Sequence, residues 1–448
     1  MPAAKTATRT PAKQTARQTG RIRPTFPVER FAMDNGLRVV VSPDPSSPVV
    51  AVAVYYDVGM RSEPEGRTGF AHLFEHLMFQ GSGSLGKTEH FTHVQGSGGT
   101  LNGSTHKDYT NYYEVLPSNA AELALFLEAD RMRSIALTQE NLDNQVAVVQ
   151  NEIRVNVHNR PYGGFPWLTL PPVLYDSFAN THDGYGSFVD LESATLDDAQ
   201  SFFDRYYAPG NAVLTVVGDV RTEQVHEWVD RHYGDLPAGK TPKRPSFQEK
   251  PLRAERREVV TDPLAPAPAV AMAWGTADPA DLDGYLPYLV LAEVLTDGDA
   301  ARLQDRLLMR DRTVTSVGGY VGVMGGSYDE RDPAPLIVEV HHPAETPLDT
   351  VLAAVDEEID RLAQDGLDTE ELNRTVARMT ARYLRELDPV MGRAQNLSVF
   401  EQQRGRAELV NELPGLLEQV SAASVQAAAA TLRADNRAVL ELRPETSA

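Results

Sequence analysis

LDDAQSFFDRYYAPGNAVLTVVGDV, residues 196–220, combines an amphipathic helix, a proline–glycine turn and a strongly apolar strand. Apolar side chains recur at helical spacing as far as Tyr207, and the β-branched residues after the turn favour an extended strand. The same order returns near the C-terminus, where a helix over 423–432 and a turn at 434–436 precede a strand at 437–442. One helix–turn–strand unit is therefore expected to close each half of the chain.

The two halves also begin alike. Residues 37–42 and 47–59 are rich in β-branched residues and predict two strands in the first half. Residues 255–260 and 265–277 predict two strands in the second half, and a helix is expected after each pair. Two copies of one α+β unit account for the length of 448 residues, which exceeds what one ordinary hydrophobic core accommodates.

A change in composition separates the copies. Residues 236–251 are rich in proline and lysine, which is typical of a linker, so we expect one domain at 25–235 and a second at 252–448. Residues 1–24 carry two lysines and four arginines, no acidic residue and no apolar secretory core. They predict a disordered basic tail, with an organellar transit peptide as the alternative.

The composition excludes several classes of function. The chain has no cysteine, so disulfides, thiolate metal sites and cysteine nucleophiles are all absent, and any metal must be bound by His, Asp or Glu. A net charge of -21 and a pI near 5.0 argue against a nucleic-acid partner. No apolar run approaches the length that spans a membrane. We expect a soluble, cytoplasmic protein that acts on a peptide, a small molecule or another protein.

The helix expected after the first strands carries an unusual set of polar residues. In HLFEHLMFQGS, residues 72–82, His72 and His76 are four positions apart and Glu75 immediately precedes the second histidine. At about 100° per residue, the three side chains share one helix face. Two imidazoles at this spacing can bind Zn²⁺, and the adjacent carboxylate can take a proton from a water. Composition alone yields such a match roughly 0.04 times in this chain, which favours a metal site over two hydrogen-bonded histidines.

The second copy offers an internal comparison for this helix. The matching helix at 285–295 has Val290 and Val294 where the first copy has histidines, and it keeps an acid at Glu293. Since valine is accepted at these positions, packing does not require histidine there. The two histidines therefore indicate a function that only the first copy performs.

A catalytic zinc usually has three protein ligands and one open position. Residues 137–159 predict a helix that ends before Pro161, and Glu152 lies on this helix among apolar neighbours. Most acids on such helices are solvated. The residues alone therefore leave two interpretations of Glu152 open, a solvated acid or a third ligand.

These residues resemble the pitrilysin/insulinase family of zinc peptidases, specifically its bacterial branch similar to mitochondrial processing peptidases. The family pattern is HxxEH followed at a set interval by a ligand glutamate, and the interval from His76 to Glu152 equals that of the family. Residues 98–113, GGTLNGSTHKDYTNYY, and 159–163, NRPYG, are similar to neighbouring family segments. The resemblance covers about residues 25–445. It implies two homologous, repeated α/β-sandwich domains of the metalloenzyme LuxS/processing-peptidase-like type.

The resemblance also implies roles for the polar residues of the first copy. His72, His76 and Glu152 would bind Zn²⁺, and Glu75 would be the general base for the water that attacks a peptide carbonyl. In the family, the segment that corresponds to 101–105 is an edge strand to which an extended peptide substrate adds.

Three residues of that segment are the substrate-binding candidates, namely Asn102, Gly103 and Ser104. Without the resemblance, the same three residues predict a polar turn instead.

This chain departs from the family pattern on the helix of the third ligand. The family usually has a second glutamate seven residues before the ligand glutamate, and Gln145 occupies this position here. Glutamine can donate a hydrogen bond, but it carries no charge and moves no proton. We therefore expect a reduced or narrowed activity with the metal ligands intact.

A second departure lies in the second copy. Family members that work alone or as homodimers carry an arginine, followed seven residues later by a tyrosine, that bind the substrate carbonyl and stabilise the oxyanion. Leu308 and Thr315 occupy these positions here, and neither can perform this role. Arg310, Arg312 and Tyr320 are nearby in the sequence and are candidates for a displaced substitute.

Together these features predict a zinc endopeptidase that cleaves short or unfolded peptides, including leader or processing segments. The missing pair predicts a heterodimer in which this chain is the catalytic subunit and a paralogous, zinc-free partner supplies the arginine and tyrosine. A self-sufficient homodimer is one alternative, and a non-catalytic assembly or scaffold subunit is the other.

Overall fold

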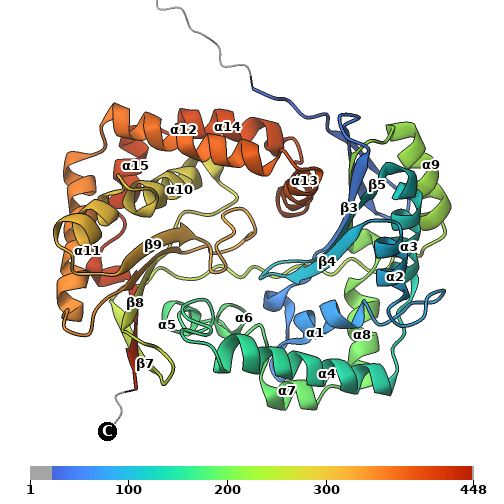
Figure 1. The fold of residues 1–448 in the computed structure, drawn as a ribbon, viewed down its shortest axis with the longest axis horizontal. Helices are drawn as coiled ribbons and strands as arrows, with labels where there is room; N and C mark the ends of the chain where they lie inside the picture. The colour runs from blue at the N-terminus through green and yellow to red at the C-terminus, as the bar shows by residue number, and fades with distance from the viewer. Residues whose placement is uncertain (1–22, 446–448) are drawn as a thin grey trace, which may run out of the picture.

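The structure is a computed structural model that describes residues 23–445 (Figure 1). The predicted basic tail at 1–24 lies outside the described residues except for its last two. Two β-sheets stand apart from each other, and helices lie around and between them. No helix among residues 23–445 combines the length and the apolar character needed to cross a membrane.

The first sheet has six strands in the order β1-β2-β6-β3-β5-β4. Strands β2 and β6 run parallel, while the other neighbours are antiparallel, so β4 is an edge strand that pairs only with β5. The strands are β1 (Glu29–Ala32), β2 (Arg38–Pro43), β3 (Val49–Tyr56), β4 (Thr100–Thr105), β5 (Thr110–Pro117) and β6 (Ala212–Gly218).

The second sheet has five strands in the order β7-β11-β8-β10-β9. Strands β7 and β11 run parallel and the remaining neighbours are antiparallel, so β9 is the edge strand that corresponds to β4. Without β1, the two sheets have the same strand order and the same directions. The strands are β7 (Arg256–Asp262), β8 (Ala269–Trp274), β9 (Ser316–Val321), β10 (Leu336–His341) and β11 (Ala438–Pro444).

The helices complete two copies of one arrangement, which confirms the predicted α+β fold with two repeated domains. The predicted closing unit is present in both halves, with α8 before β6 and α15 before β11. The helices are α1 (Phe70–Leu77), α2 (Glu89–Gly96), α3 (Ala121–Arg133), α4 (Gln139–Ile153), α5 (Pro171–Leu174), α6 (Phe178–Thr181), α7 (Phe188–Glu192), α8 (Leu196–Tyr206), α9 (Thr222–Tyr233), α10 (Leu282–Thr296), α11 (Leu348–Asp365), α12 (Thr369–Glu386), α13 (Val390–Arg404), α14 (Leu409–Gln419) and α15 (Ala422–Ala429).

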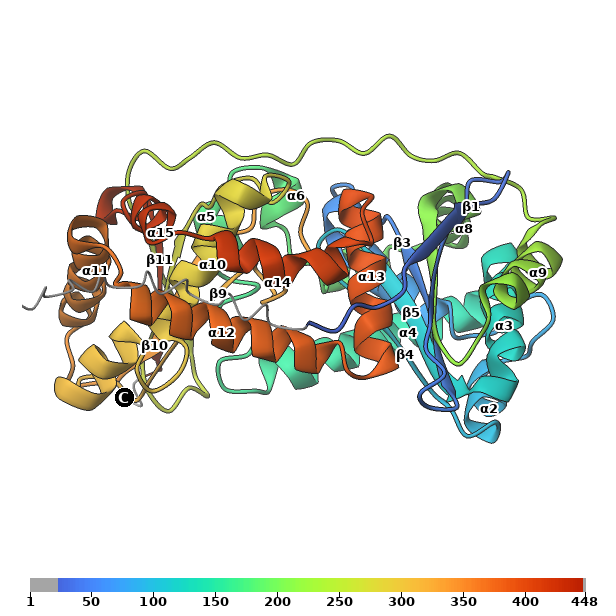
Figure 2. The same ribbon diagram turned by 90° about the horizontal axis from the view of Figure 1, so that it is seen from above.

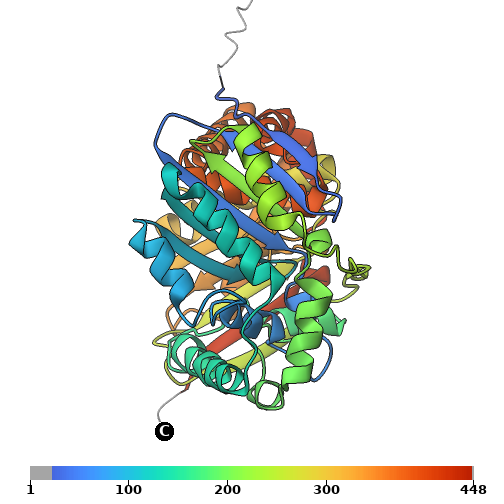
Figure 3. The ribbon, with the colours of Figure 1, turned by 90° about the vertical axis from the view of Figure 1, so that its right-hand side faces the viewer.

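The first sheet is covered on both faces, and this explains the apolar run of its central strand. Strand β3, VVAVAVYY, is buried along nearly its whole length. Helices of the first half, including α3, cover one face, which is turned toward the viewer in Figure 3. Helix α13, from the second half, packs on the opposite face against β3 and β6. A strand buried on both faces favours continuous apolar sequence over alternation.

The two halves interlock across the segment that joins them. Ser398 on α13 donates a hydrogen bond to the Thr215 hydroxyl of β6 at 2.8 Å. In the opposite direction, α5 of the first half packs on β7 and β11 of the second. Figure 2 shows the joining segment between α9 and β7 as an extended strap along one side of the molecule. Elements of each half therefore pack on the sheet of the other half, and the predicted domain division at 236–251 stays a prediction.

Candidate metal centre

Helix α1, which carries the HxxEH motif, is anchored at its first turn by a buried carboxylate. Glu63 is 3% exposed and accepts hydrogen bonds from the amides of Gly69 and Ala71 at 2.9 and 2.7 Å. Its Oε2 also lies 3.0 Å from Nε2 of His182. A carboxylate at a helix N-terminus satisfies free amides and favours the helix dipole. The direction of α1, and of the side chains on it, is thereby fixed.

The structure brings His72, His76 and Glu152 together. The two Nε2 atoms are 3.3 Å apart, and the Glu152 oxygens lie 3.7 Å from His72 and 3.4 Å from His76. Ligands about 2.0–2.1 Å from a tetrahedral zinc ion are separated by roughly 3.3 Å. The three donor atoms therefore fit around one zinc ion. Spacing along the chain alone does not decide whether Glu152 is a solvated acid or a third ligand, and this geometry supports the ligand.

The protonation of these groups also suits a divalent cation. Burial, together with the nearby His76, lowers the pKa of His72 to about 4. The hydrogen bond with His76 outweighs burial and lowers the pKa of Glu152 to about 2. At neutral pH, His72 is thus a neutral imidazole and Glu152 a carboxylate, which are the forms that bind zinc.

A second group of potential ligands is buried and consists of His90 on α2, Glu114 on β5 and Glu128 on α3. Its geometry differs from the first, because His90 Nε2 lies only 2.6 Å from Glu114 Oε1. This is a hydrogen-bond distance, and it is too short for two ligands of one zinc ion. Arg131 donates to both oxygens of Glu128 and lies 4.2 Å from the Tyr112 ring. We interpret this group as a buried ion-pair cluster that supports β5.

The candidate general base lies against the edge strand. Thr105 of β4 donates a hydrogen bond to Glu75 Oε2 at 2.7 Å. Burial raises the pKa of Glu75, and the Thr105 hydroxyl opposes this shift. A Cβ on Gly103 would lie 3.2 Å from Glu75 Cγ, so a glycine at this position avoids a tight contact with the Glu75 side chain. Thr105 is not among the predicted site residues, although it lies in the segment 98–113 that resembles the family.

The three substrate-binding candidates, Asn102, Gly103 and Ser104, lie in the middle of β4. They form the predicted edge strand, and the alternative of a polar turn is wrong. Since β4 pairs only with β5, its outer main-chain groups are left for another strand. Figure 1 shows that this edge is turned toward the second half.

A cavity of about 600 Å³ opens beside the three ligands and is lined from both halves. Tyr185 connects its wall to the metal centre, because its hydroxyl donates to Glu152 Oε1 at 3.0 Å and its ring packs edge-on against His72. Burial raises the pKa of Tyr185 to about 12, so the hydroxyl keeps its proton. The other lining residues are Met60, Glu75, Gly103, Ser104, Thr105, Phe165, Pro166, Trp167, Tyr320, Val323, Met324, Gly325 and Glu339.

We expect Tyr185→Phe to weaken zinc binding about tenfold, because outer partners of metal ligands orient them and raise affinity. Competition against a chelating dye would measure this affinity directly. Tyr288→Phe is the matched control, since the Tyr288 hydroxyl contacts Thr431 in the second half at 3.0 Å. Equal zinc affinity of Tyr185→Phe and the unmodified chain would show that the hydroxyl does not orient Glu152.

The residues that depart from the family pattern lie in different surroundings. Gln145 is buried on α4 and does not line the cavity. Leu308 packs on the core of the second half, and the Thr315 hydroxyl donates to the carbonyl of His341. Among the candidates for a displaced substitute, only Tyr320 lines the cavity. Arg310 is half exposed and pairs with Asp305, and Arg312 is exposed.

The second half has an ion pair where the first half has its metal ligands. Counted from the caps of their helices, Arg382 on α12 occupies the same position as Glu152 on α4. Arg382 bonds both oxygens of Glu293, the counterpart of Glu75. This half can therefore stabilise the same fold without a metal.

Two family models match the chain. The model described as Insulinase (Peptidase family M16) matches residues 38–161, and the model described as Peptidase M16 inactive domain matches residues 193–379. The second description agrees with the ion pair that replaces the ligands in the second half.

Curated relatives match over different lengths. The zinc protease PqqE of Helicobacter pylori is 34% identical over 46% of this chain and 47% of its own length. A probable mitochondrial-processing peptidase subunit beta of Arabidopsis thaliana is 27% identical over 47% of this chain and 39% of its own. An uncharacterized zinc protease of Streptomyces coelicolor is 23% identical over 94% of this chain and 89% of its own length. The chain thus spans about half the length of the first two of these relatives.

Solved structures support the fold. A protease from Helicobacter pylori superimposes with a TM-score of 0.86 at 22% identity, over 94% of this chain and 100% of the other. A peptidase M16 inactive domain from Pseudomonas fluorescens gives a TM-score of 0.83 at 16% identity, over 94% of this chain and 99% of the other. Both likenesses extend through the two halves of the chain.

Proposed function

Because the chain belongs to the insulinase family of peptidases (family M16), we propose that it is a zinc-dependent endopeptidase that cleaves short or unfolded peptides, including leader or processing segments. The observation that carries this proposal is the set of donor atoms of His72, His76 and Glu152, 3.3 to 3.7 Å apart, with Glu75 beside them. This complete set disfavours the alternative of a non-catalytic scaffold subunit.

In this proposal, Glu75 takes a proton from the attacking water and delivers it to the leaving nitrogen. A zinc ion held by His72, His76 and Glu152 would supply Lewis acidity, which acidifies a water and polarises a peptide carbonyl. The raised pKa of Glu75 helps it to hold the proton between the two steps. The hydrogen bond from Thr105 keeps the carboxylate turned toward the cavity.

The substrate would bind as an additional strand on β4. An extended peptide can pair with the free outer edge of this strand, and main-chain hydrogen bonds then provide affinity without a strict sequence requirement. The edge faces the second half, which contributes Tyr320 and Met324 to the cavity. Because only extended backbone can pair with such an edge, this geometry favours short or unfolded substrates.

We further propose a zinc-free relative as the partner of this chain. Among the described residues that line the metal cavity, none is an arginine. A partner of the same fold could supply the arginine that stabilises the oxyanion. The relative from Arabidopsis thaliana is named as one subunit of a processing peptidase.

A self-sufficient homodimer is the second candidate, and Tyr320 favours it. This tyrosine reaches the metal cavity from the second half. Burial raises its pKa above the usual range, so its hydroxyl can donate a hydrogen bond to an oxyanion. It could thus provide half of the missing pair.

The purified chain should contain close to one zinc ion and should cleave quenched peptides efficiently only with its zinc-free relative. Zinc content and cleavage, measured with and without the partner, test both the peptidase function and the need for a partner. Full activity of the chain alone would support the homodimer and contradict the partner proposal. Absence of zinc, with no cleavage under either condition, would contradict the peptidase proposal and favour a scaffold subunit.

A further inference from the structure

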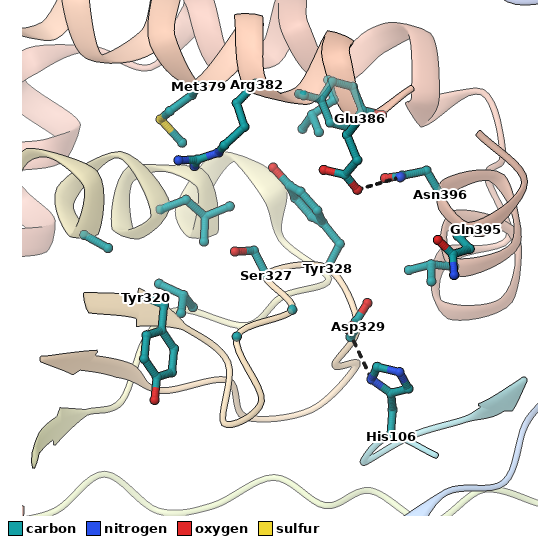
Figure 4. A pocket seen from close by; sticks show the side chains of 18 of the residues that line it. His106, Tyr320, Ser327, Tyr328, Asp329, Met379, Arg382, Glu386, Gln395 and Asn396 are labelled. Atoms are coloured by element: carbon teal, nitrogen blue, oxygen red, sulfur yellow. Dashed lines mark hydrogen bonds and ion pairs between the residues drawn. The ribbon is translucent and has the colours of Figure 1, made fainter. Parts of the chain in front are cut away.

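Strand β7 forms one edge of the second sheet and pairs only with β11. The other edge, β9, faces the interior between the two halves, where Tyr320 lines the cavity drawn in Figure 4. Figure 1 shows β7 at the periphery of the second half, away from that interior. An additional strand at β7 would therefore leave the metal cavity open.

The first sheet shows what such an edge can bind. Strand β2 has the place of β7 there, because β2 runs parallel to β6 as β7 runs parallel to β11. The outer side of β2 is covered by β1, which pairs with it in the antiparallel direction. Within residues 23–445, no strand covers the outer side of β7. The second half thus leaves open an edge that the first half closes with an antiparallel strand.

Every other residue of β7 directs its main-chain groups outward. The amide of Arg256 and the carbonyl of Asp262 both bond toward β11. Since this direction alternates along a strand, the amides and carbonyls of Arg257, Val259 and Thr261 point away from the sheet. No hydrogen bond within the described part of the chain engages these outward groups. Such a row of free groups is a template for another strand.

A second copy of this chain fits this edge through its own β7. In an antiparallel pair with a twofold axis at Val259, the outward residues oppose each other, with Arg257 opposite Thr261 and Val259 opposite itself. All seven residues of the strand then have a partner. The two Val259 side chains, each 45% exposed in the single chain, would cover one another.

The charges of β7 are complementary in this register, which places Arg256 of each copy opposite Asp262 of the other. Asp262 accepts hydrogen bonds from the amides of Tyr162 and Leu264 at 2.7 Å. No lysine or arginine within residues 23–445 forms an ion pair with its carboxylate. Arg256 pairs with Asp176, whose side chain is 69% exposed, so this pair is weak. A second copy would supply the cation that Asp262 lacks.

Other registers of the same pairing bring like charges together. A slip of two residues would oppose Glu258 to Glu258 in one direction and Glu258 to Asp262 in the other. A slip of four residues would oppose Arg257 to Arg257, or would place Pro263, which has no amide hydrogen, in the ladder. Like charges directly opposite each other destabilise a sheet. The charges of this edge strand therefore favour a single register.

From these observations we propose that β7 is the contact surface for a second copy of this chain. The two copies would join their second sheets into one, across a twofold axis at Val259. The proposal is independent of the peptidase function and of the homodimer considered with it, because no residue of β7 lines the metal cavity. One strand pair buries less surface than a standard interface, so we expect a Kd on the order of 10 µM.

Single cysteines test the register, because the chain has no cysteine of its own. In the proposed pair, the Cα atoms of the two Val259 residues would be about 5.5 Å apart, which a disulfide can span. Val259→Cys should therefore form a covalent dimer under mild oxidation. Thr261→Cys is the matched control, since its two Cα atoms would be about 14 Å apart and should stay unlinked. Equal cross-linking of the two variants, or cross-linking of neither, would overturn the proposal.

Sedimentation velocity of the full chain measures the association without oxidation. Val259→Pro removes one outward amide, and proline is accepted where the amide of an edge strand faces solvent. This variant should raise the Kd at least about tenfold.

Should Val259→Pro fold poorly, as judged by circular dichroism, Arg256→Glu provides the second test, because it places like charges opposite each other at Asp262. Arg385→Glu is the control for this change, since it reverses the same charge at an exposed position of α12, and it should leave the Kd unchanged. A chain that stays monomeric at about 100 µM, tenfold above the expected Kd, would overturn the contact surface. A dimer that survives both substitutions in β7 would overturn it as well.

Discussion

Replacing Glu75 with glutamine should lower kcat/KM about 10³-fold while zinc content stays unchanged. Glutamine has nearly the same shape, and its carbonyl oxygen can still accept the 2.7 Å hydrogen bond from Thr105. It cannot take a proton from water, so only the proton transfer is removed. Peptide cleavage and metal analysis on the same preparation measure the two properties separately.

Glu140→Gln is the control for this change. Glu140 is exposed in the first turn of α4, the helix that also carries Glu152, and lies outside the metal cavity. This variant should keep both zinc and activity. Undiminished cleavage by Glu75→Gln would show that another group accepts the proton. Loss of zinc from Glu75→Gln would instead show that the carboxylate binds the metal.

The duplicated fold could be predicted from the sequence because its signals are local. Runs of β-branched residues predict strands, and the helix–turn–strand units at 196–220 and 423–442 repeat in the same order. The spacing of His72, Glu75 and His76 also predicts one shared helix face. The β-branched runs, each helix–turn–strand unit and the histidine spacing all depend on residues that are close together in the sequence.

The contacts that complete the site could not be predicted in this way, because they join distant segments. Thr105 reaches Glu75 and Tyr185 reaches Glu152 only through the packing of β4 and of the loop before α7 on α1 and α4. Helix α13, which covers the first sheet, is also distant in the sequence from the strands that it contacts, as the hydrogen bond from Ser398 to Thr215 shows. The periodicity of a single segment does not reveal which distant segment it packs against.

The interlock also makes one buried arginine critical to stability. Arg61 is 2% exposed and forms ion pairs with Asp108 at 2.9 Å and Glu330 at 2.8 Å. Asp108 belongs to the first half, whereas Glu330 lies in the β9–β10 loop of the second. Arg244 of the joining segment also pairs with Asp108. Arg61 thus lies where the two halves and the segment between them meet.

We expect Arg61→Leu to lower the free energy of unfolding by about 3–5 kcal/mol, because it leaves the buried Glu330 without its ion-pair partner and Asp108 with Arg244 alone. Urea unfolding would measure this loss. Arg133→Leu is the control and should leave the midpoint near that of the unmodified chain, since the pair of Arg133 with Asp235 is exposed. An unchanged midpoint for Arg61→Leu would show that Arg244 and neighbouring amides compensate both acids.

The pH dependence of this loss separates unpaired charge from lost packing. Burial acts to raise the pKa of Asp108, but Arg61 and Arg244 lower it overall. Burial raises the pKa of Glu330 even with Arg61 present. Without Arg61 both values rise, and Glu330, whose pKa is already raised, makes the variant lose stability as pH increases from its unfolded-state value near 4 through its raised folded-state value. The deficit should therefore be smaller at pH 5 than at pH 7, whereas a packing defect would cost the same at both.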